Sequence, residues 1–357
     1  MSTLHWHPDV LSLTLASLHS HMMPIRVGLE SYAQSPSELS PVPATQEAWL
    51  SELSAKQTEH DQALFAQVNE DFALHHQDPS SLSMTQLLKA LLTMGRTLEF
   101  TQEESLVLAQ AWMHQSLREG RFEPLKWPTR IKDFVPKERG SEFHFEPCEK
   151  LKLYAVLPDA QWVDRMAQAG VPTVQLRVKS SDRGALSREV KEAVQAVKGT
   201  ATQLFINDHW QEAIEHGAFG VHLGQEDLQS ASLKEIEQAQ CRLGVSTHGY
   251  TEMLKAHALR PSYMALGAVF PTTLKQMQTL PQGLGRLSAY AQLMSPYSLV
   301  AIGGIDESQF QAVLSCGVGS IAVVRALVAA DKPEVQVKKL LSYFERSEEN
   351  LTGLPGL

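Results

Sequence analysis

Cysteine is scarce in this sequence, with three residues in a chain of 357. Cys148, Cys241 and Cys316 lie far apart, and none of them has the close spacing of a metal-binding pair. Three is also an odd number, so the pattern predicts neither a disulfide framework nor a cysteine-based zinc site. Unpaired thiols are typical of a reducing compartment, and we therefore expect a cytoplasmic location.

Long hydrophobic runs are also absent. No apolar stretch is long enough to cross a bilayer, and the first residues show no basic region followed by an apolar segment. We expect neither a membrane span nor a targeting segment. Excess positive charge is lacking too: the formal net charge is -9. This balance argues against nucleic acid or an anionic membrane as the main partner and favours small molecules.

The length and composition predict two domains. A chain of 357 residues with 43% hydrophobic residues exceeds one average domain and can bury a sizeable core. The apolar pattern changes near residue 150; before it, helical spacing such as Leu106, Ala109 and Met113 indicates a mostly α-helical region. The expected division is a helical amino-terminal domain at 1–125, a linker at 126–150, an α/β domain at 151–346 and a tail at 347–357.

After residue 150, short β-branched or apolar runs alternate with amphipathic stretches of helical period. The expected strands are 152–157, 173–177, 203–206, 219–222, 242–246, 263–266, 299–302 and 320–324. Eight strand-helix units predict an α/β fold that closes as a (β/α)8 TIM barrel. A doubly wound parallel sheet is the alternative. In a barrel, the active site lies at the carboxyl ends of the strands.

The second expected strand ends in cationic and amide side chains. Alternation along Gln175-Leu-Arg177-Val-Lys179 points Gln175, Arg177 and Lys179 to one side. Two cations and an amide suit an anion with several phosphate oxygens. Ordinary rim charges paired with acids are the alternative explanation.

Two aspartates follow neighbouring expected strands. Asp208 ends the run 204–208 and Asp227 ends the run 220–227, so both should lie at one rim. Mg²⁺ prefers one or two carboxylates together with phosphate oxygens, and this pair would suffice. Helix N-capping is the alternative role for both residues. Asn207 could hydrogen-bond a heteroaromatic ring or close a turn.

The fifth expected strand ends in hydroxyl groups and a histidine. The Ser246 hydroxyl could donate to an oxyanion at the rim. We do not expect a catalytic triad with His248, because no strained Gly-x-Ser-x-Gly turn surrounds Ser246 and no acid can be assigned to orient the imidazole.

Three later segments could complete an anion site. The long polar segment 270–283 is typical of a loop that closes over a substrate, and Lys275 would be its cation. Gly303 and Gly304 follow the seventh strand, and Val324-Arg325 follows the eighth, where barrels of this kind form a phosphate site. The glycine pair could instead serve a tight turn.

With these residues in hand, the region from about 150 to 345 resembles the thiamine phosphate synthase family. The matching motifs, in chain order, are Leu153-Tyr154, 175–179, Asn207-Asp208, 220–227, 244–246, 267–272, Lys275 and 301–305. The family joins hydroxymethylpyrimidine diphosphate to a thiazole phosphate and releases pyrophosphate. The resemblance therefore implies a transferase of thiamine biosynthesis whose partners are these two small molecules.

The resemblance also implies a role for each matched residue. The residues implied to hold the pyrimidine diphosphate are Gln175, Arg177, Lys179, Asn207, Ser246 and Lys275. Those implied for the thiazole phosphate are Thr272, Thr273, Gly303, Gly304, Val324 and Arg325. Asp208 and Asp227 would bind the cofactor Mg²⁺. Arg177, Ser246 and Lys275 would be the catalytic set.

The expected reaction is dissociative. An electron-rich aminopyrimidine can stabilise a carbocation once the leaving diphosphate is neutralised, and the thiazole nitrogen then attacks. Two departures concern the thiazole phosphate: Leu274 stands where the family usually has Thr, and Arg325 where it often has Ser. We expect the Arg325 guanidinium to offset the missing hydroxyl.

Two other functions are alternatives for such a barrel. A thiazole tautomerase would need a proton shuttle such as His248 and no paired carboxylates. The second is a non-catalytic module that binds thiamine precursors, and under this alternative Leu274 and Arg325 would indicate lost activity. The region before residue 150 lies outside the resemblance, although Met84–Gly120 is faintly similar to the closing helices of hydroxymethylpyrimidine phosphate kinases. We expect a vestigial or structural domain there. A homo-oligomer is compatible with the sequence.

Overall fold

The computed structural model describes residues 100–119, 127–134, 142–149, 151–180, 182–272 and 281–352. The chain divides into two compact units, Met1–Glu138 and Arg139–Leu357. Most of the predicted helical domain, including nearly half of the segment 84–120, lies outside the described residues, so its predicted character stays a prediction.

The described part of the first unit is held together by one helix and a short helical turn. These elements are α5 (Gln102–Glu119) and α6 (Ile131–Phe134). Arg118 on α5 forms a two-pronged salt bridge with buried Asp133 on α6, with Nε–Oδ1 at 2.8 Å and Nη2–Oδ2 at 2.6 Å. The Trp112 and Trp127 rings meet edge to face at 5.2 Å between centroids. An ion pair and an aromatic contact therefore join the two elements.

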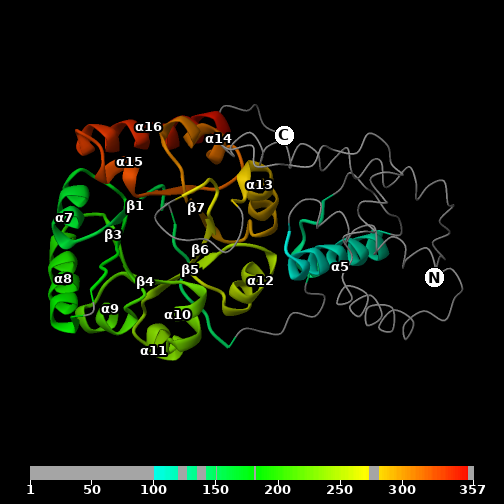
Figure 1. Ribbon diagram of the computed structural model, residues 1–357, viewed down its shortest axis with the longest axis horizontal. Coiled ribbons are helices and arrows are strands. Elements are labelled where there is room, and N and C mark those ends of the chain that lie inside the picture. The colour runs from blue at the N-terminus through cyan, green and yellow to red at the C-terminus, as the bar shows by residue number, and fades with distance from the viewer. Residues whose placement is uncertain are drawn as a thin grey trace, which may run out of the picture. The chain divides into compact units, whose positions relative to one another are not determined.

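The second unit contains a closed barrel of parallel strands (Figure 1). The strands are β1 (Leu153–Leu157), β2 (Thr173–Leu176), β3 (Gln203–Asn207), β4 (Gly220–Leu223), β5 (Arg242–Thr247), β6 (Tyr263–Gly267), β7 (Ser298–Ile302) and β8 (Ser320–Val323). They pair in chain order, and β8 closes the sheet against β1, where Tyr154 faces Ala322. The predicted TIM barrel is confirmed, and each observed strand end lies within one residue of its expected position.

Helices follow the strands and surround them (Figure 1). Those of the second unit are α7 (Ala160–Gln168), α8 (Arg183–Ala196), α9 (Trp210–His216), α10 (Gln225–Ser230), α11 (Leu233–Gln238), α12 (Tyr250–Leu259), α13 (Gly283–Leu293), the 3-10 turn η1 (Glu307–Gln309), α14 (Phe310–Leu314), α15 (Arg325–Val328) and α16 (Pro333–Thr352). Local sequence sets several ends. Asp159 caps α7 by accepting the Trp162 N–H, and Asp182 caps α8. Gly217, with φ of +71°, ends α9 in the left-handed conformation.

Aromatic side chains fill the barrel interior. The Tyr154, Phe205 and Tyr263 rings lie 5.1 to 6.0 Å apart between centroids. Two glycines make room for them, because a Cβ at Gly220 would lie 2.6 Å from the Phe205 ring and one at Gly244 would lie 2.2 Å from the Tyr263 ring. Small residues on β4 and β5 thus face large rings from β3 and β6.

Residues 142–149 lie against the amino-terminal end of the barrel. The Phe145 N–H donates to Arg260 O at 3.3 Å and the Cys148 N–H to Ser262 O at 3.1 Å, just before β6 begins. Cys148 and Leu151 belong to the same buried cluster as Tyr154 and Tyr263. This part of the expected linker therefore contributes to the barrel core. The charged residues of the barrel rim lie at the opposite end, where the strands have their carboxyl ends.

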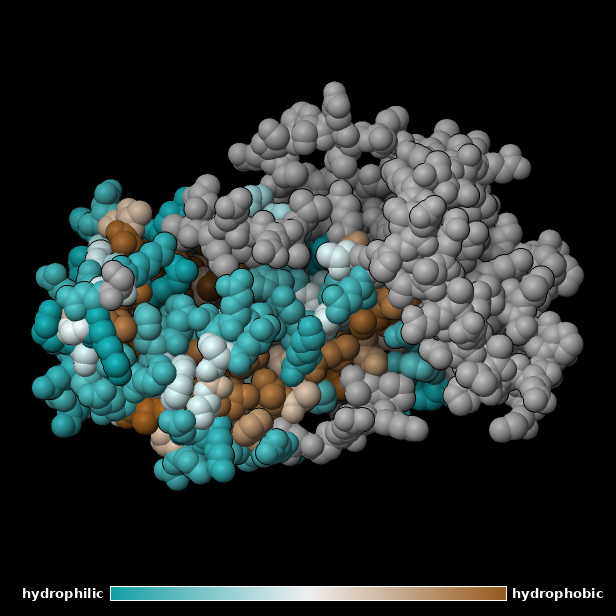
Figure 2. All heavy atoms as spheres, turned by 60° about the horizontal axis from the view of Figure 1, so that its bottom comes forward, coloured by the Kyte–Doolittle hydropathy of each residue, from teal (hydrophilic) through white to brown (hydrophobic). Residues whose placement is uncertain are grey.

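The described surface is largely hydrophilic. Figure 2 shows hydrophilic residues over most of the coloured area in that view, with hydrophobic residues in a band between them. Val335 on α16 is a large hydrophobic side chain with high exposure, 60%. Within the described ranges, no helix combines the length and the apolar character that a membrane crossing requires.

Candidate active site at the carboxyl end of the barrel

Asp208 and Asp227 come together where β3 and β4 end. Asp208 directly follows β3, adopts a left-handed backbone with φ of +63°, and donates its N–H to His222 O at 2.9 Å. The Asn207 amide donates to Asp208 Oδ2. Asp227 lies in the first turn of α10, close enough to Asp208 for its charge to raise the pKa of that carboxyl. The two expected metal ligands therefore form one pair, and Asp208 holds a conformation that non-glycine residues seldom adopt.

Electrostatics within this pair are unfavourable. Burial, followed by the charge of Asp227 and a hydrogen bond to it, raises the pKa of Asp208 to about 6, whereas Arg177 acts in the opposite direction. Neither aspartate serves as the N-cap of the helix it precedes or begins: His209 and Gly224 hold those positions on α9 and α10. The pair is thus a concentration of negative charge that helix capping does not explain.

The side chains at the end of β2 pass from the interior to the solvent. Gln175 is buried and donates its amide to the Tyr154 hydroxyl at 3.0 Å. Arg177 is half-buried, and its charge lowers the pKa of Asp208, which places it beside the acid pair. Lys179 is exposed. The structure thus places an amide, a guanidinium and an ammonium at increasing exposure along one segment.

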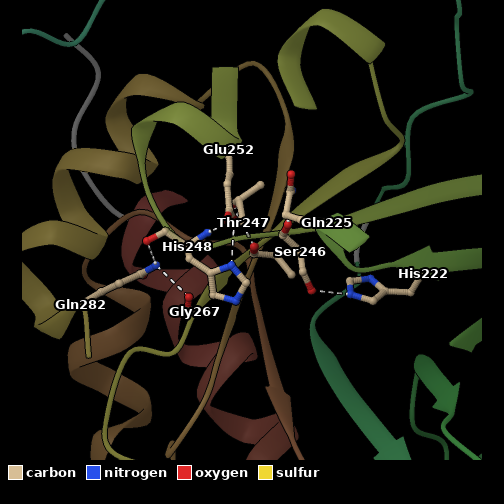
Figure 3. A network of polar contacts seen from close by, with 9 residues as sticks. His222, Gln225, Ser246, Thr247, His248, Glu252, Gly267 and Gln282 are labelled. Atoms are coloured by element: carbon tan, nitrogen blue, oxygen red, sulfur yellow. Dashed lines mark hydrogen bonds and ion pairs between the residues drawn. The ribbon is translucent and has the colours of Figure 1, made fainter. Parts of the chain in front are cut away.

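Ser246 on β5 is held by residues of β4 and α10. Its hydroxyl lies 2.8 Å from His222 Nε2, and its carbonyl accepts the Gln225 side-chain amide at 2.7 Å. Figure 3 shows His222 on one side of Ser246 and His248 on the other, with the Ser246 hydroxyl directed toward His222.

His248 has an acidic partner that we did not expect. Its Nδ1 lies 2.7 Å from Glu252 Oε2, and its backbone N–H donates to the same oxygen at 2.9 Å (Figure 3). Burial alone would raise the pKa of Glu252, but the hydrogen bond and charge of His248 lower it overall. The expectation that no acid orients His248 is therefore wrong. Ser246 nevertheless bonds to His222, so these groups do not form a Ser-His-acid triad.

Gln282, which directly precedes α13, joins two segments of the rim. Its amide donates to Gly267 O at 3.0 Å and to His248 O at 3.2 Å (Figure 3). Because Gln282 is almost fully buried, these bonds fix the end of β6 relative to the segment after β5.

The glycine pair after β7 lies against the segment after β6. Gly303 and Gly304 have φ of +101° and +68°, and a Cβ at Gly304 would lie 2.5 Å from Pro271 O. The Phe270 N–H donates to Gly303 O at 2.9 Å. Close backbone approach therefore requires glycine here, as the tight-turn alternative anticipated. Phosphate binding by this pair stays a prediction.

Other residues expected for the thiazole phosphate are only partly described. Thr272 is half-buried at the end of a described segment. Val324 precedes α15, and Arg325 is exposed in its first turn. Thr273, Leu274 and Lys275 lie outside the described residues, and so does most of the expected covering loop.

Another group of candidate metal ligands among the described residues lies on α9. It consists of Glu212, Glu215 and His216. Arg183 Nε lies 3.4 Å from Glu212 Oε1, and Ser187 Oγ lies 2.8 Å from His216 Nε2. A guanidinium and a hydroxyl thus already contact this group, in contrast to the mutually repelling acids at the rim.

Sequence reasoning missed Tyr154, His222, Gln225, Glu252, Tyr263 and Gln282 as parts of the site. Glu252 could have been found, because i,i+4 spacing places it one turn from His248. His222 lies in a quoted motif, and strand alternation would have pointed it inward. The tyrosine contacts depend on which strands face each other across the closed barrel.

A barrel with an acid pair, a guanidinium and a hydroxyl at the carboxyl ends of its strands defines an enzyme that acts on a charged small molecule. Residues 153–327 match the family model described as Thiamine monophosphate synthase. The chain is 54% identical over 195 residues to a thiamine-phosphate synthase of Neisseria meningitidis, covering 55% of this chain and 95% of the relative. It is 46% identical over 200 residues to one of Yersinia pestis, covering 56% and 93%.

A solved structure agrees with these relatives. The thiamine phosphate pyrophosphorylase from Pyrococcus furiosus superposes with a TM-score of 0.50 and 28% identity, covering 56% of this chain and 97% of that one. The chain belongs to the thiamine monophosphate synthase family. It is an enzyme, a transferase that joins a pyrimidine and a thiazole. The predicted family, fold and activity are thereby confirmed.

Proposed function

We propose that this rim joins hydroxymethylpyrimidine diphosphate to a thiazole phosphate by a dissociative reaction that depends on Mg²⁺. The observation that carries the proposal is the acid pair, in which Asp208 directly follows β3 and Asp227, in the first turn of α10, lies close enough for its charge to act on Asp208. Two carboxylates in contact fit Mg²⁺, which takes one or two of them and completes its shell with phosphate oxygens and water. When bound there, Mg²⁺ would neutralise charge on the leaving diphosphate.

The cationic residues of the chain would hold the diphosphate. Arg177 lies beside the acid pair, so its guanidinium can reach an anion bound there, and exposed Lys179 extends this charge outward. Lys275 would add a third cation from the covering loop. Together these residues would stabilise the negative charge that develops as the bond to the pyrimidine breaks.

Neutral polar groups would orient the pyrimidine. Asn207 commits one amide hydrogen to Asp208, and Gln175 commits one to Tyr154, so each carbonyl oxygen is directed by a fixed amide. The Ser246 hydroxyl would donate to a diphosphate oxygen. No protein base is required, because the aminopyrimidine stabilises its own cation and the thiazole nitrogen attacks it directly. The pairing of Ser246 with His222 rather than with a His-acid couple suits this role.

The thiazole phosphate would lie toward the segments after β6, β7 and β8. The residues proposed to hold it are Thr272, Thr273, Gly303, Gly304, Val324 and Arg325. Gly303 and Gly304 bring the segments after β6 and β7 within hydrogen-bonding distance of each other, which supports a shared pocket. Arg325 would supply the positive charge.

We also propose a cytoplasmic location with small molecules as the partners. Cys148, Cys241 and Cys316 are all free, which is typical of a reducing compartment. Burial raises the pKa of the Cys148 thiol to about 12, so this cysteine is unreactive in the folded state.

The test is a synthase assay on the purified full chain. Both substrates are supplied with and without Mg²⁺, and thiamine phosphate and pyrophosphate are measured together. The proposal requires equal amounts of the two products and loss of both when a chelator removes the metal. Full activity in the presence of the chelator would contradict the role assigned to Asp208 and Asp227.

A further inference from the structure

A continuous chain of hydrogen bonds crosses the barrel interior from β2 to β5. It runs from Gln175 Nε2 to the Tyr154 hydroxyl at 3.0 Å, then to the Tyr263 hydroxyl at 2.7 Å. The Tyr263 hydroxyl lies 2.7 Å from His222 Nδ1, and His222 Nε2 lies 2.8 Å from Ser246 Oγ. Its two ends, Gln175 and Ser246, are both proposed to contact the pyrimidine diphosphate.

The links of this chain are shielded from solvent. The exposed fractions are 4% for Gln175, 2% for Tyr154, 0% for Tyr263 and 6% for His222. The Tyr263 ring stacks on His222 with 5.6 Å between centroids. The ring also lies directly against the Gly244 backbone, so close that any Cβ at this position would overlap the ring. Polar groups buried this deeply must satisfy one another, so the direction of each bond is constrained.

The direction follows from the donor at one end. An amide nitrogen has hydrogens and no acceptor, so Gln175 donates to the Tyr154 oxygen. If Tyr263 also donated to Tyr154, the Tyr154 hydrogen would be left without a partner among the described hydrogen bonds of this buried hydroxyl. Tyr154 therefore donates to Tyr263, and Tyr263 donates to His222 Nδ1. His222 must then carry its hydrogen on Nε2 and donate it to Ser246 Oγ.

We infer that Tyr154, Tyr263 and His222 are positioning residues that fix the hydroxyl proton of Ser246 toward the substrate. Because Ser246 accepts from His222, its own hydrogen remains available for a diphosphate oxygen, whereas the opposite tautomer would draw that hydrogen toward the imidazole. This inference rests on the proposed function for the role of Ser246, but the tautomer of His222 does not depend on it.

The first experiment reads the tautomer in the full chain. Proton-nitrogen correlation spectra of protein labelled with ¹⁵N at histidine distinguish Nε2–H from Nδ1–H, and the signals missing from a His222→Gln variant identify His222. The inference requires Nε2–H in the wild type. A predominant Nδ1–H form would overturn it, whether or not the protein makes thiamine phosphate.

The second experiment measures coupling to Ser246. Tyr263→Phe removes the hydrogen that Nδ1 accepts, and we expect kcat to fall by about ten-fold with the thiazole phosphate KM unchanged, which corresponds to about 1.4 kcal/mol. In a Ser246→Ala background, the same change should have little further effect on kcat. Independent losses that multiply would show a merely structural role and would contradict the inference.

Two further variants serve as controls. Tyr290→Phe removes a hydroxyl from a buried tyrosine of α13, a helix that contributes no member to this chain of bonds, and its ring packs on Tyr250 with 4.9 Å between centroids. We expect kcat to be retained there. His222→Gln can present an N–H near the Nε2 position whereas His222→Asn is too short, so activity should be recovered partly by Gln alone. Equal loss in both variants would count against donation from Nε2.

Discussion

The interior and the rim of this barrel treat polar groups in opposite ways. In the interior, Tyr154, Tyr263 and His222 join Gln175 to Ser246 with every link bonded. At the rim, Asp208 and Asp227 face each other as like charges, and Asp208 adopts a left-handed backbone. Interior polar groups stabilise the fold and set positions, whereas the rim retains unfavourable charge that a ligand can relieve. We therefore expect substitutions at the rim to lower activity and to raise stability, and substitutions in the interior to lower stability.

The largest effect on activity should come from the acid pair. We expect Asp227→Asn to lower kcat/KM at limiting Mg²⁺ by on the order of 100-fold, which corresponds to about 3 kcal/mol for a lost charged contact. Exposed Glu226 provides the matched control, because Glu226→Gln removes the same charge one residue away. A steady-state assay across Mg²⁺ concentrations measures both variants. Near-normal rates for Asp227→Asn would refute the metal assignment.

Replacing Asp208 of the same pair with Asn should make the protein more stable than the wild type. Because the pKa of Asp208 rises from 3.8 to about 6 on folding, the folded state retains a proton that the unfolded state loses between these values. Stability therefore falls as pH rises through that window, by up to about 3 kcal/mol and less with solvent screening. Asn tolerates the left-handed conformation, so Asp208→Asn should remove the penalty.

Urea unfolding without Mg²⁺ at pH 4 and at pH 8 measures this effect. The advantage of Asp208→Asn should be small at pH 4 and full at pH 8. Adding Mg²⁺ should stabilise the wild type and not the variant, and below about pH 6 the wild-type response should weaken as Asp208 takes up a proton. Equal stability of the two proteins at both pH values would show that the acid pair carries no unfavourable charge.

An interior change should act in the reverse direction. Gly244→Ala places a Cβ 2.2 Å from the Tyr263 ring, so the ring or the strand must shift. We expect a loss of about 1 to 3 kcal/mol in the free energy of unfolding, as for other overpacked cores. Gly170→Ala is unsuitable as a control because its φ is +83°, whereas Gly319→Ala has open space. A wild-type melting temperature for Gly244→Ala would show that the interior is more adaptable than its packing indicates.

Arg325 should give a smaller and more selective effect. We expect Arg325→Ala to raise the thiazole phosphate KM by about ten-fold, or about 1.4 kcal/mol, with the pyrimidine diphosphate KM nearly unchanged. Arg325→Ser should recover part of the loss. Initial rates with each substrate varied in turn measure both constants. Unchanged kinetics in Arg325→Ala would mean that this exposed side chain faces the solvent and does not contact the thiazole phosphate.

The smallest effect should come from removing the first unit. A chain that begins at Arg139 keeps the strands, their helices and the segment 142–149, and we expect wild-type activity from it. A chain that begins at Leu151 lacks Cys148 and Phe145 at the amino-terminal end of the barrel and should unfold at lower temperature. Inactivity of the longer piece would show that the first unit takes part in catalysis.

Much of the barrel could be predicted because its determinants are local. The alternation of apolar runs with helical periods places every strand, and residues in the segments that follow the strands must share one rim, which brings Asp208 to Asp227. The bond between Tyr154 and Tyr263 could not be found this way. It joins residues far apart in the chain, and it depends on barrel closure and on the space that Gly244 leaves.

The contact between Gly244 and Tyr263 also constrains how this barrel can evolve. A side chain at 244 and a large ring at 263 exclude each other, so either change alone is penalised, and the two positions should vary together among relatives. Replacing Tyr263 with a small residue would open a void that Ala or Ser at 244 could fill. Recovery of stability by that second substitution would show that positions 244 and 263 are energetically coupled.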